Sequence, residues 1–442
     1  MVSEWRRTSL REAGVALIDC DHRTPPPAET GYPYVAIPQL KEGRLALANV
    51  RRISPEHFIE WTRKARPQHH DVILSRRCNP GETAYVPVGL ECALGQNLVL
   101  LRADGSQLYP PFLRWLVRGP HWWEQVGTFI NVGAVFDSLK CADIPNFKMP
   151  LPPLMEQKAI AAVLGALDDK IELNRRMNAT LEAMARALFQ SWFVDFDPVR
   201  AKLDDCQPIG LDVATAALFP KHFEHGADGM LPAGWHLMAI EEICTVNSST
   251  LGKSDDLGTL EYVEISEVNR GNIANIVKYA RGEEPSRARR RLRHGDTVLS
   301  TVRPDRGAYV LALNPPENRV ASTGFAVLTP TKAPWSFVHA AMTQPEVSEL
   351  LGQMADGGAY PAVRPEIIGA MRVAVPNEPK VFEAFHRICS PLFEMAEANR
   401  AQSRTLTTLR DTLLPKLLSG ELSVAAVEES KAPRSLSQHN NT

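Results

Sequence analysis

Residues 151–174 read LPPLMEQKAIAAVLGALDDKIELN, and this stretch predicts where a domain ends and a long helix begins. Proline is tolerated in the first turn of a helix but not in its interior, so Pro152 and Pro153 close a domain and open a helix. Residues then alternate in steps of four and three, which indicates a helix with one heptad-like seam. The seam consists of Ile160, Leu164, Leu167, Ile171, Asn174, Asn178, Leu181, Ala185, Leu188 and Trp192. We predict a helix of roughly 40 residues, about 60 Å long.

The same pattern returns 225 residues later, where Asn174-Arg175 is repeated as Asn399-Arg400. The shifted seam consists of Phe385, Cys389, Leu392, Ala396, Asn399, Ser403, Leu406, Arg410, Leu413 and Leu417. This seam is weaker because Arg410 is a poor core residue, and we expect Leu409 to replace it on the apolar face. Gly420 is typical of the position that follows a helix end.

The segments that precede the two helices also repeat. Short β-rich runs broken by Gly, Pro and Asn indicate mixed α/β domains, with short helices expected within residues 111–125 and 213–219. The repeated segments are His70–Arg77 with Gly295–Arg303, Tyr34–Ile37 with Tyr262–Ile265, and Gly95–Leu100 with Gly324–Leu328. One large repeat means two copies of a domain-plus-helix unit, an architecture suited to binding two similar targets at a fixed separation.

The predicted organisation follows from these signals. It has α/β domains at residues 1–150 and 231–376, long helices at 151–196 and 377–422, a connector at 197–230 and a disordered tail at 423–442. The two helices can bury their seams against each other. Antiparallel packing would send the domains to opposite ends, whereas parallel packing would set them side by side, and the long connector permits either.

Asn174 and Asn399 occupy equivalent places in the two seams. A buried Asn in a seam costs stability but fixes register and partner orientation. The alternative is that both side chains face water, because Asn is common on helix surfaces.

Composition narrows the class of protein. The chain has 442 residues, a formal charge of −2, 44% hydrophobic and 23% charged residues, which is ordinary for a soluble globular protein of two or three domains. It has no apolar run of membrane-span length and no secretory signal. Its seven cysteines are scattered and lack a C-x-x-C pair, which indicates reduced thiols in a cytoplasmic protein rather than a disulfide frame or a zinc site.

Two basic clusters are the candidate binding surfaces, and they occupy equivalent places in the repeats. The first contains Arg51, Arg52, Arg63, Lys64, Arg66, Arg76 and Arg77. The second contains Arg287, Arg289, Arg290, Arg291, Arg293, Arg303 and Arg306. Arginine can pair with phosphate or with the guanine edge in the major groove. A solvated charged face is the alternative for either cluster alone, but matched placement favours two domains that meet the same kind of anion.

Motifs for catalysis are missing from the sequence. There is no G-x-x-x-x-G-K-[ST] phosphate loop. Asn314–Glu317 (NPPE) lacks the aromatic residue of the adenine-methyltransferase loop, so we interpret it as a turn. His69-His70-Asp71 keeps only one His beside its Asp in the second repeat, and Gly357-Gly358-Ala359 has no helix start nearby. We therefore predict no catalytic residue and no metal site.

The chain resembles the specificity subunits of type I restriction–modification enzymes. The resemblance is carried by Leu151–Gln157 (LPPLMEQ), Leu167–Asn174 (LDDKIELN), Phe189–Lys202 with its FDPVRAK ending, Gly210–Asp212, Ala217–Pro220, Leu231–Trp235 (LPAGW) and Leu413–Leu422 (LLPKLLSGEL). It covers the chain apart from the tail, and it is specific in the helices and connector but weak inside the α/β domains. The first domain lacks a Pro-x-Gly-Trp start, and residues 376–378 (PNE) lack the Pro-Pro-x-x-Glu-Gln pattern.

The resemblance implies two α/β target-recognition domains held apart by an antiparallel helix pair. It implies that each domain reads one half of a bipartite, asymmetric site in double-stranded DNA, with an unread spacer between the halves. It further implies docking of two methyltransferase subunits, which carry S-adenosylmethionine, and of two restriction subunits, which use ATP and Mg²⁺. This chain would then hold no cofactor and be non-catalytic.

Two alternatives belong to other classes of protein. A self-contained adenine-N6 DNA methyltransferase would bind S-adenosylmethionine without partners. A purely structural scaffold would not show salt-dependent, sequence-specific binding to duplex DNA.

Overall fold

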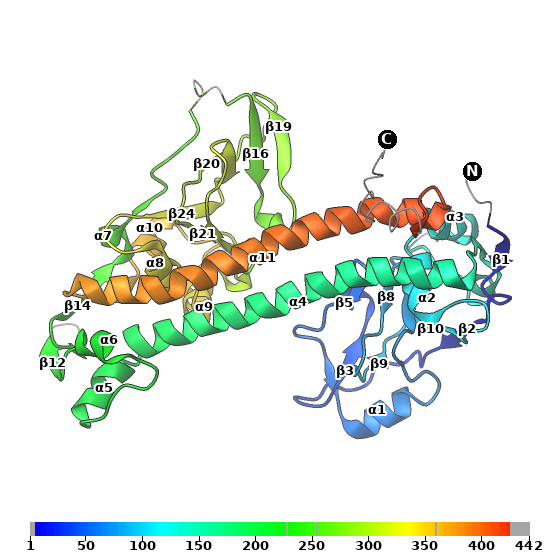
Figure 1. Ribbon diagram of the computed structural model, residues 1–442, viewed down its shortest axis with the longest axis horizontal. Helices are drawn as coiled ribbons and strands as arrows, with labels where there is room; N and C mark the ends of the chain where they lie inside the picture. Colours follow the sequence, from blue (N-terminus) through cyan, green and yellow to red (C-terminus); the bar gives the residue numbers. More distant parts are fainter. Residues whose placement is uncertain are drawn as a thin grey trace, which may run out of the picture. The chain divides into compact units, whose positions relative to one another are not determined.

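The computed structural model describes residues 5–133, 135–226, 229–252, 255, 257–358 and 360–424. The predicted disordered tail, 423–442, lies outside these residues except for its first two positions. The chain forms two compact units, one from Met1–Ile171 with Arg404–Thr442 (unit 1) and one from Glu172–Ser403 (unit 2). The long helices α4 (Leu154–Phe193) and α11 (Pro379–Ser419) each contribute one part to each unit (Figure 1).

Unit 1 is built around a four-stranded antiparallel sheet with the order β2-β10-β7-β8. Smaller sheets have the orders β6-β3-β9, β1-β11 and β4-β5. The strands are β1 (Arg7–Ser9), β2 (Val15–Asp19), β3 (Tyr32–Val35), β4 (Leu40–Lys41), β5 (Arg44–Leu45), β6 (Arg52–Ile53), β7 (Val72–Ser75), β8 (Thr83–Tyr85), β9 (Ala93–Leu94), β10 (Leu98–Ala103) and β11 (Lys148–Pro150). The short helices are α1 (Pro55–Trp61), α2 (Pro110–Leu116) and α3 (Pro120–Phe129), with 3-10 turns η1 (Ile37–Gln39) and η2 (Ile144–Asn146).

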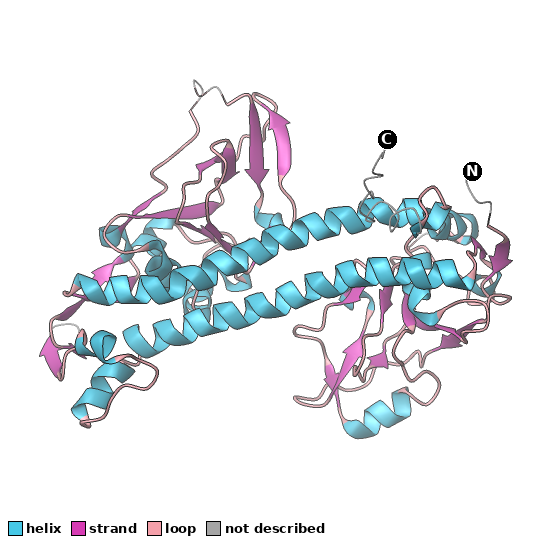
Figure 2. Ribbon diagram, in the orientation of Figure 1, coloured by secondary structure: helices cyan, strands magenta, loops and turns pink. Residues whose placement is uncertain are grey.

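Unit 2 repeats this plan with the sheets β15-β24-β21-β22, β19-β16-β23-β20, β14-β25 and β17-β18, and with β12-β13 in the connector (Figure 2). Its strands are β12 (Phe223–Gly226), β13 (Gly229–Pro232), β14 (Trp235–Ala239), β15 (Cys244–Val246), β16 (Thr259–Val263), β17 (Val268–Asn269), β18 (Asn272–Ile273), β19 (Val277–Ala280), β20 (Ala288–Arg291), β21 (Asp296–Ser300), β22 (Tyr309–Ala312), β23 (Arg319–Ser322), β24 (Phe325–Pro330) and β25 (Arg372–Pro376). Its short helices are α5 (Asp197–Leu203), α6 (Val213–Ala217), α7 (Ile240–Ile243), α8 (Trp335–Met342), α9 (Pro345–Gln353) and α10 (Pro365–Gly369), with 3-10 turns η3 (Ile265–Glu267) and η4 (Pro304–Arg306).

Strand register fixes which residues are equivalent in the two units. Ser75 of β7 pairs with Leu98 of β10, and Ser300 of β21 pairs with Phe325 of β24. Leu98 therefore corresponds to Phe325, so the paired segments Gly95–Leu100 and Gly324–Leu328 contain equivalent strand starts, and Gly324 is equivalent to Asn97. Asn97, which directly precedes β10, adopts a left-handed φ of 68°.

The expected single helix within residues 111–125 is interrupted. Gly119 is extended, with ψ of 169°, and Pro120 starts α3. Proline disfavours helical geometry in the residue before it and cannot donate a backbone hydrogen bond, so the helix divides there into α2 and α3.

In unit 1, the first part of α4 packs antiparallel against the last part of α11. Asp168 contacts Arg410, and further toward the start of α4, Glu156 accepts a hydrogen bond from the backbone N of Val424. The hydrophobic core of unit 1 combines apolar residues of both long helices with residues of α2 and α3. It includes Ile160, Leu164, Leu414, Leu417, Phe112, Trp115 and Trp122.

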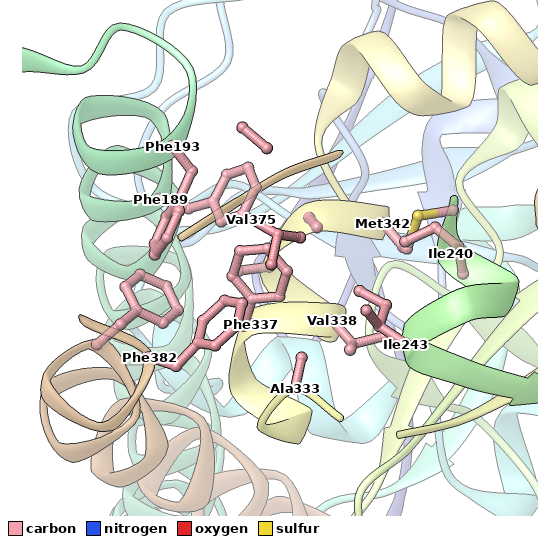
Figure 3. Packing of buried hydrophobic residues seen from close by; sticks show 14 of the residues in the cluster. Phe189, Phe193, Ile240, Ile243, Ala333, Phe337, Val338, Met342, Val375 and Phe382 are labelled. Atoms are coloured by element: carbon pink, nitrogen blue, oxygen red, sulfur yellow. The ribbon is translucent and has the colours of Figure 1, made fainter. Parts of the chain in front are cut away.

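In unit 2, the last part of α4 packs antiparallel against the first part of α11. Asn178 contacts Ala396, and earlier in α4, Asn174 contacts Ser403. Phe189 and Phe193 of α4 meet Phe337 of α8, and Phe382 of α11 lies at the same junction (Figure 3). These aromatic rings join the helices to the α/β part of the unit, so burial of apolar area stabilises that junction.

The second seam departs from the sequence prediction at one position. Arg410 is only 5% exposed, whereas Leu409 is 45% exposed. Arg410 occupies the seam because Asp168 lies opposite it on α4 and neutralises its charge. The apolar pattern along one helix carries no signal of a buried charge pair whose partners lie on two different helices.

Within the described ranges, no helix is long and apolar enough to cross a membrane. All seven cysteines are unpaired.

Candidate nucleic-acid interface

The same turn follows the central buried strand in both units. β7 ends at Ser75, whose hydroxyl donates to the carbonyl of Arg77 at 2.9 Å, and β21 ends at Ser300, whose hydroxyl donates to the carbonyl of Val302 at 2.7 Å. The next residue is left-handed in each case, with φ of 65° at Cys78 and 47° at Arg303. A buried serine thus makes the chain leave the sheet in the same way twice.

A second loop lies against each of these turns and supplies an aromatic ring. The backbone of Arg77 forms an isolated antiparallel β-bridge with Ser138. The guanidinium of Arg77 lies 5.5 Å from the ring centroid of Phe136. In unit 2, the backbone of Val302 forms an isolated antiparallel β-bridge with Ala362. The guanidinium of Arg303 lies 4.7 Å from the ring centroid of Tyr360. Each unit therefore presents an arginine over an aromatic ring in this turn, at Arg77 in unit 1 and one position further along, at Arg303, in unit 2.

The first predicted cluster contains both tethered and exposed side chains. Arg51 and Arg52 donate to the carbonyls of Pro25 and Gly31, at 3.2 and 2.7 Å, and Arg66 pairs with Glu91 at 2.6 Å. Arg76 is half-buried, and its Nε has no hydrogen-bond partner among the described residues. Arg63, Lys64 and Arg77 are exposed, and so are the tethered Arg51, Arg52 and Arg66. The structure thus brings Arg76 and Arg77 to the turn but leaves Arg63 and Lys64 beyond helix α1.

Three of the seven arginines in the second predicted cluster lie on β20, and the cluster is partly neutralised. Arg289 lies 3.6 Å from Glu284, and Arg291 lies 3.5 Å from both Asp255 and Glu317. Burial lowers the pKa of Arg290, which is half-buried. The exposed members are Arg287, Arg293 and Arg306. Only Arg303 and Arg306 belong to the turn that follows β21, so the fold does not gather the second cluster onto one strand end.

A buried carboxylate in unit 1 holds three arginines that come from three different elements. Asp168 of α4 is 3% exposed and contacts Arg410 of α11 at 2.6 Å, Arg44 of β5 at 3.0 Å, and Arg114 of α2. Burial raises the pKa of this carboxyl, but Arg114, Arg44 and Arg410 outweigh burial and hold the pKa below its ordinary value. The Asp168 cluster therefore ties the α/β part of unit 1 to both long helices.

The asparagines of the seam bond across the helix pair in unit 2. The amide of Asn174, which is fully buried, donates to the carbonyl of Asn399 at 3.2 Å and to the side chain of Gln402 at 2.9 Å. The amide of Asn399 donates to Asn178 at 2.9 Å. These contacts are the kind that a register role requires, and the role itself stays a prediction.

The His69-His70-Asp71 motif has a structural explanation. The two histidine rings stack with centroids 3.6 Å apart, and the carboxylate of Asp71 accepts two hydrogen bonds from Arg102, at 2.8 and 2.7 Å. The register places Thr329 where unit 1 has Arg102. The equivalent Asp296 consequently lacks an arginine partner at that position, and burial raises its pKa.

One group in the described part of the chain has metal-ligand spacing, namely Asp19, Cys20 and His22. The thiol of Cys20 donates to the carbonyl of Gly95 at 3.2 Å, and burial raises its pKa to about 11.

Sequence reasoning missed Phe136, Tyr360 and the Asp168 cluster. Phe136 and Tyr360 lie in loops without periodicity, where an aromatic residue carries no signal of its position in the fold. Two clues were present nevertheless. Residues 132–136 (VGAVF) are apolar in a loop, and LDDKIELN places an acidic residue beside the seam.

Comparison with known proteins gives a consistent result. Residues 26–183 match the family described as "Type I restriction modification DNA specificity domain". The chain is 26% identical over 410 residues to the type I restriction enzyme HindI specificity subunit of Haemophilus influenzae, across 79% of this chain and 86% of that protein. It is 22% identical over 299 residues to the MjaIX specificity subunit of Methanocaldococcus jannaschii, across 67% and 65% of the two chains.

The fold has a solved counterpart. The S subunit of a type I restriction–modification system from M. genitalium superposes with a TM-score of 0.54 at 16% identity, covering 93% of this chain and 96% of that one. At this identity the likeness concerns the fold alone. The mixed α/β architecture predicted from the sequence is confirmed.

Proposed function

Because this chain belongs to the family of type I restriction–modification specificity subunits, we propose that each α/β domain reads one half of a bipartite, asymmetric DNA site. The helix pair sets the length of the unread spacer between the halves. As a specificity subunit the chain recognises DNA and carries no catalytic site of its own.

The observation that carries this proposal is the repeated turn after β7 and β21. The frame of the turn is the same, since Ser75 and Ser300 make the same hydrogen bond. The side chains that it displays differ, because Arg76 and Arg77 in unit 1 correspond to Thr301 and Val302 in unit 2. Two turns with the same backbone hydrogen bond but different side chains suit two domains that recognise different base sequences.

The helix pair is proposed to dock the methyltransferase subunits. α4 and α11 expose apolar side chains on faces that the seam does not use, and the exposed set is Leu154, Met155, Leu173, Met184, Ile388, Met395 and Leu409. Two methyltransferase subunits would carry S-adenosylmethionine, and two restriction subunits would use ATP and Mg²⁺. Double-stranded DNA completes the assembly.

The test is to map methylated adenines in the source genome with and without this gene. Loss of one split, non-palindromic motif on deletion is the expected result. Unchanged methylation would contradict the proposal. The purified chain should bind a duplex carrying the motif with a steep salt dependence, whereas binding of S-adenosylmethionine by the chain alone would favour the self-contained methyltransferase.

A further inference from the structure

A groove of about 340 Å³ in unit 1 adjoins the turn that follows β7. Its walls are formed by residues 36–39, Thr24, Tyr34, Arg51 and Gln96. Gln96 directly precedes Asn97, whose carbonyl accepts a hydrogen bond from the backbone N of Arg76 at 2.8 Å. Ligand pockets in proteins range from roughly 300 to 1,000 Å³, so the groove has a size that suits one small group such as a nucleobase.

The polar side chains of the groove keep hydrogen-bonding groups that the protein does not use. Gln96 donates through Nε2 to the hydroxyl of Thr24 at 3.2 Å. Gln39 accepts through Oε1 from the backbone N at the start of η1, at 3.0 Å. Arg51 donates through Nη1 to the carbonyl of Pro25 at 3.2 Å. Within the described residues, Oε1 of Gln96, Nε2 of Gln39 and Nη2 of Arg51 have no hydrogen-bond partner. One acceptor and two donors are therefore left, each on a side chain that another hydrogen bond holds in place.

This mixture of an acceptor with donors fits a base better than a phosphate. A phosphate oxygen only accepts hydrogen bonds, so the carbonyl oxygen of Gln96 would repel it. The edge of a base offers donors as well as acceptors, and glutamine and arginine are side chains that pair with adenine and guanine in the major groove. Ile37 and Pro38 add apolar surface that suits a thymine methyl group or the face of a base.

Unit 2 carries different side chains at the equivalent positions. Tyr34 and Tyr262 occupy the same place, since each pairs with a parallel strand, β9 or β23. On its other side Tyr34 pairs with Arg51, and Val277 takes that position beside Tyr262. The 3-10 turns η1 and η3 and the strand starts of β10 and β24 give two more matches, which are Glu267 for Gln39 and Thr323 for Gln96. An ionised Glu267 only accepts hydrogen bonds and Val277 makes none, so the two units present different hydrogen-bonding patterns at one place in the fold.

We propose that this groove reads one base pair of the half-site that unit 1 recognises, with Gln96, Gln39 and Arg51 as specificity-determining residues. The base edge accepts hydrogen bonds from Arg51 and Gln39 and donates one to Gln96. The inference rests on the proposed function and names the residues that carry it out in unit 1.

The experiment grafts the side chains of unit 2 onto the groove of unit 1, in the full chain assembled with its methyltransferase subunits. The variants are Arg51→Val, Gln39→Glu and Gln96→Thr, made singly and combined. Arg51→Lys keeps the charge but loses the planar fork, so it separates base reading from phosphate attraction. Arg52→Val is the matched control, because Arg52 is exposed at the next position and also donates to one backbone carbonyl, but does not line the groove. The readout is the methylated motif in a randomised plasmid library.

The expected result is a change confined to one position of one half-site. Each groove variant, Arg51→Lys included, should lower discrimination at that position by about 10-fold. The other half-site and the spacer should stay as in the unaltered complex, which shows that the variant complexes fold and assemble. Arg52→Val should keep the whole motif.

Three outcomes count against the proposals. An unchanged motif in the single variants and in the combined variant overturns this inference, and so does an equal loss of affinity for all sequences, which would indicate phosphate contact. Stabilisation of the DNA-free chain by a single deoxynucleoside, with an unchanged motif, would indicate a small-molecule site and also overturns it. Absence of any split motif in the unaltered complex would instead overturn the proposed function.

Discussion

Asp168 illustrates how a single buried charge organises unit 1. Moving a carboxylate out of water costs several kcal/mol, and the cost is recovered only when partners surround it. Arg44, Arg114 and Arg410 provide that surrounding, and they come from a strand, a short helix and a long helix. Asp168 is therefore a connection between elements as well as an ion pair.

We expect Asp168→Asn to destabilise unit 1 by about 3–5 kcal/mol, because three buried or half-buried guanidiniums lose their common counter-charge. Hydrogen exchange of the full chain would show faster exchange in β7 and β10, with β21 and β24 of unit 2 little changed. Asp169→Asn is the matched control, since Asp169 is exposed on the next position of the same helix. Equal exchange in the two variants would contradict a connecting role for Asp168.

The same carboxylate gives unit 1 a defined response to acid. The folded pKa of Asp168 lies below its ordinary value of 3.8, so its contribution to stability is present above that value and is lost as the pH falls through the folded pKa. Exchange protection of unit 1 should therefore drop below about pH 4 more steeply in the unaltered chain than in Asp168→Asn. Parallel pH profiles for the two proteins would show that other carboxylates dominate.

At the scale of the element, the long helices meet through polar as well as apolar contacts. Asn174, Asn178 and Asn399 exchange amide hydrogen bonds where equivalent residues of the two repeats face each other. An apolar seam of the same shape would be more stable but would admit neighbouring registers.

We expect Asn174→Leu to raise thermal stability slightly while broadening the spacer lengths that the assembled complex accepts, because the polar contact that selects one register is lost. Methylated-site mapping on a library of spacer lengths measures this. Arg175→Leu is the control, since Arg175 is exposed on the same turn. A single unchanged spacer in Asn174→Leu would remove the register role from this asparagine.

A heptad inserted beside Asn174 in α4 and another beside Asn399 in α11 should keep the seams paired. Seven helical residues add about 10 Å, which corresponds to roughly three base pairs of spacer. An insertion in α4 alone should instead mismatch the seams and reduce assembly with the methyltransferase subunits. Unchanged spacing at full activity after the paired insertion would exclude the helices as the ruler.

At the scale of the whole molecule, the two α/β domains are expected to act separately. Exchanging residues 1–150 for the equivalent domain of a relative should change one half-site and leave the other half-site and the spacer unaltered. The methylated motif of the chimera measures this directly. A change in both half-sites would refute the assignment of one domain to one half-site.

Much of this architecture could be predicted from sequence because it repeats and because helix seams are local patterns. The heptad seam predicted α4 and α11, and the echo of residues 70–77 in residues 295–303 predicted β7 and β21. What escaped prediction depends on contacts between distant segments. Arg410 is acceptable in a seam only because Asp168 faces it, and Phe136 is informative only beside Arg77. Such pairs cannot be recognised until the fold brings them together.

The Asp168–Arg410 pair has no charged counterpart in the other half of the molecule. The residues 225 positions away are Phe393 and Ala185, and both lie in the apolar and aromatic core of unit 2. Desolvation of ions becomes less costly on warming, whereas apolar burial loses its driving force on cooling. Unit 1 is thus joined to its helices by an ion cluster in addition to an apolar core, whereas unit 2 has an apolar and aromatic core at the equivalent positions. Cold should therefore loosen the junction of unit 2 more than that of unit 1, so a lowered temperature would act unequally on the two α/β domains.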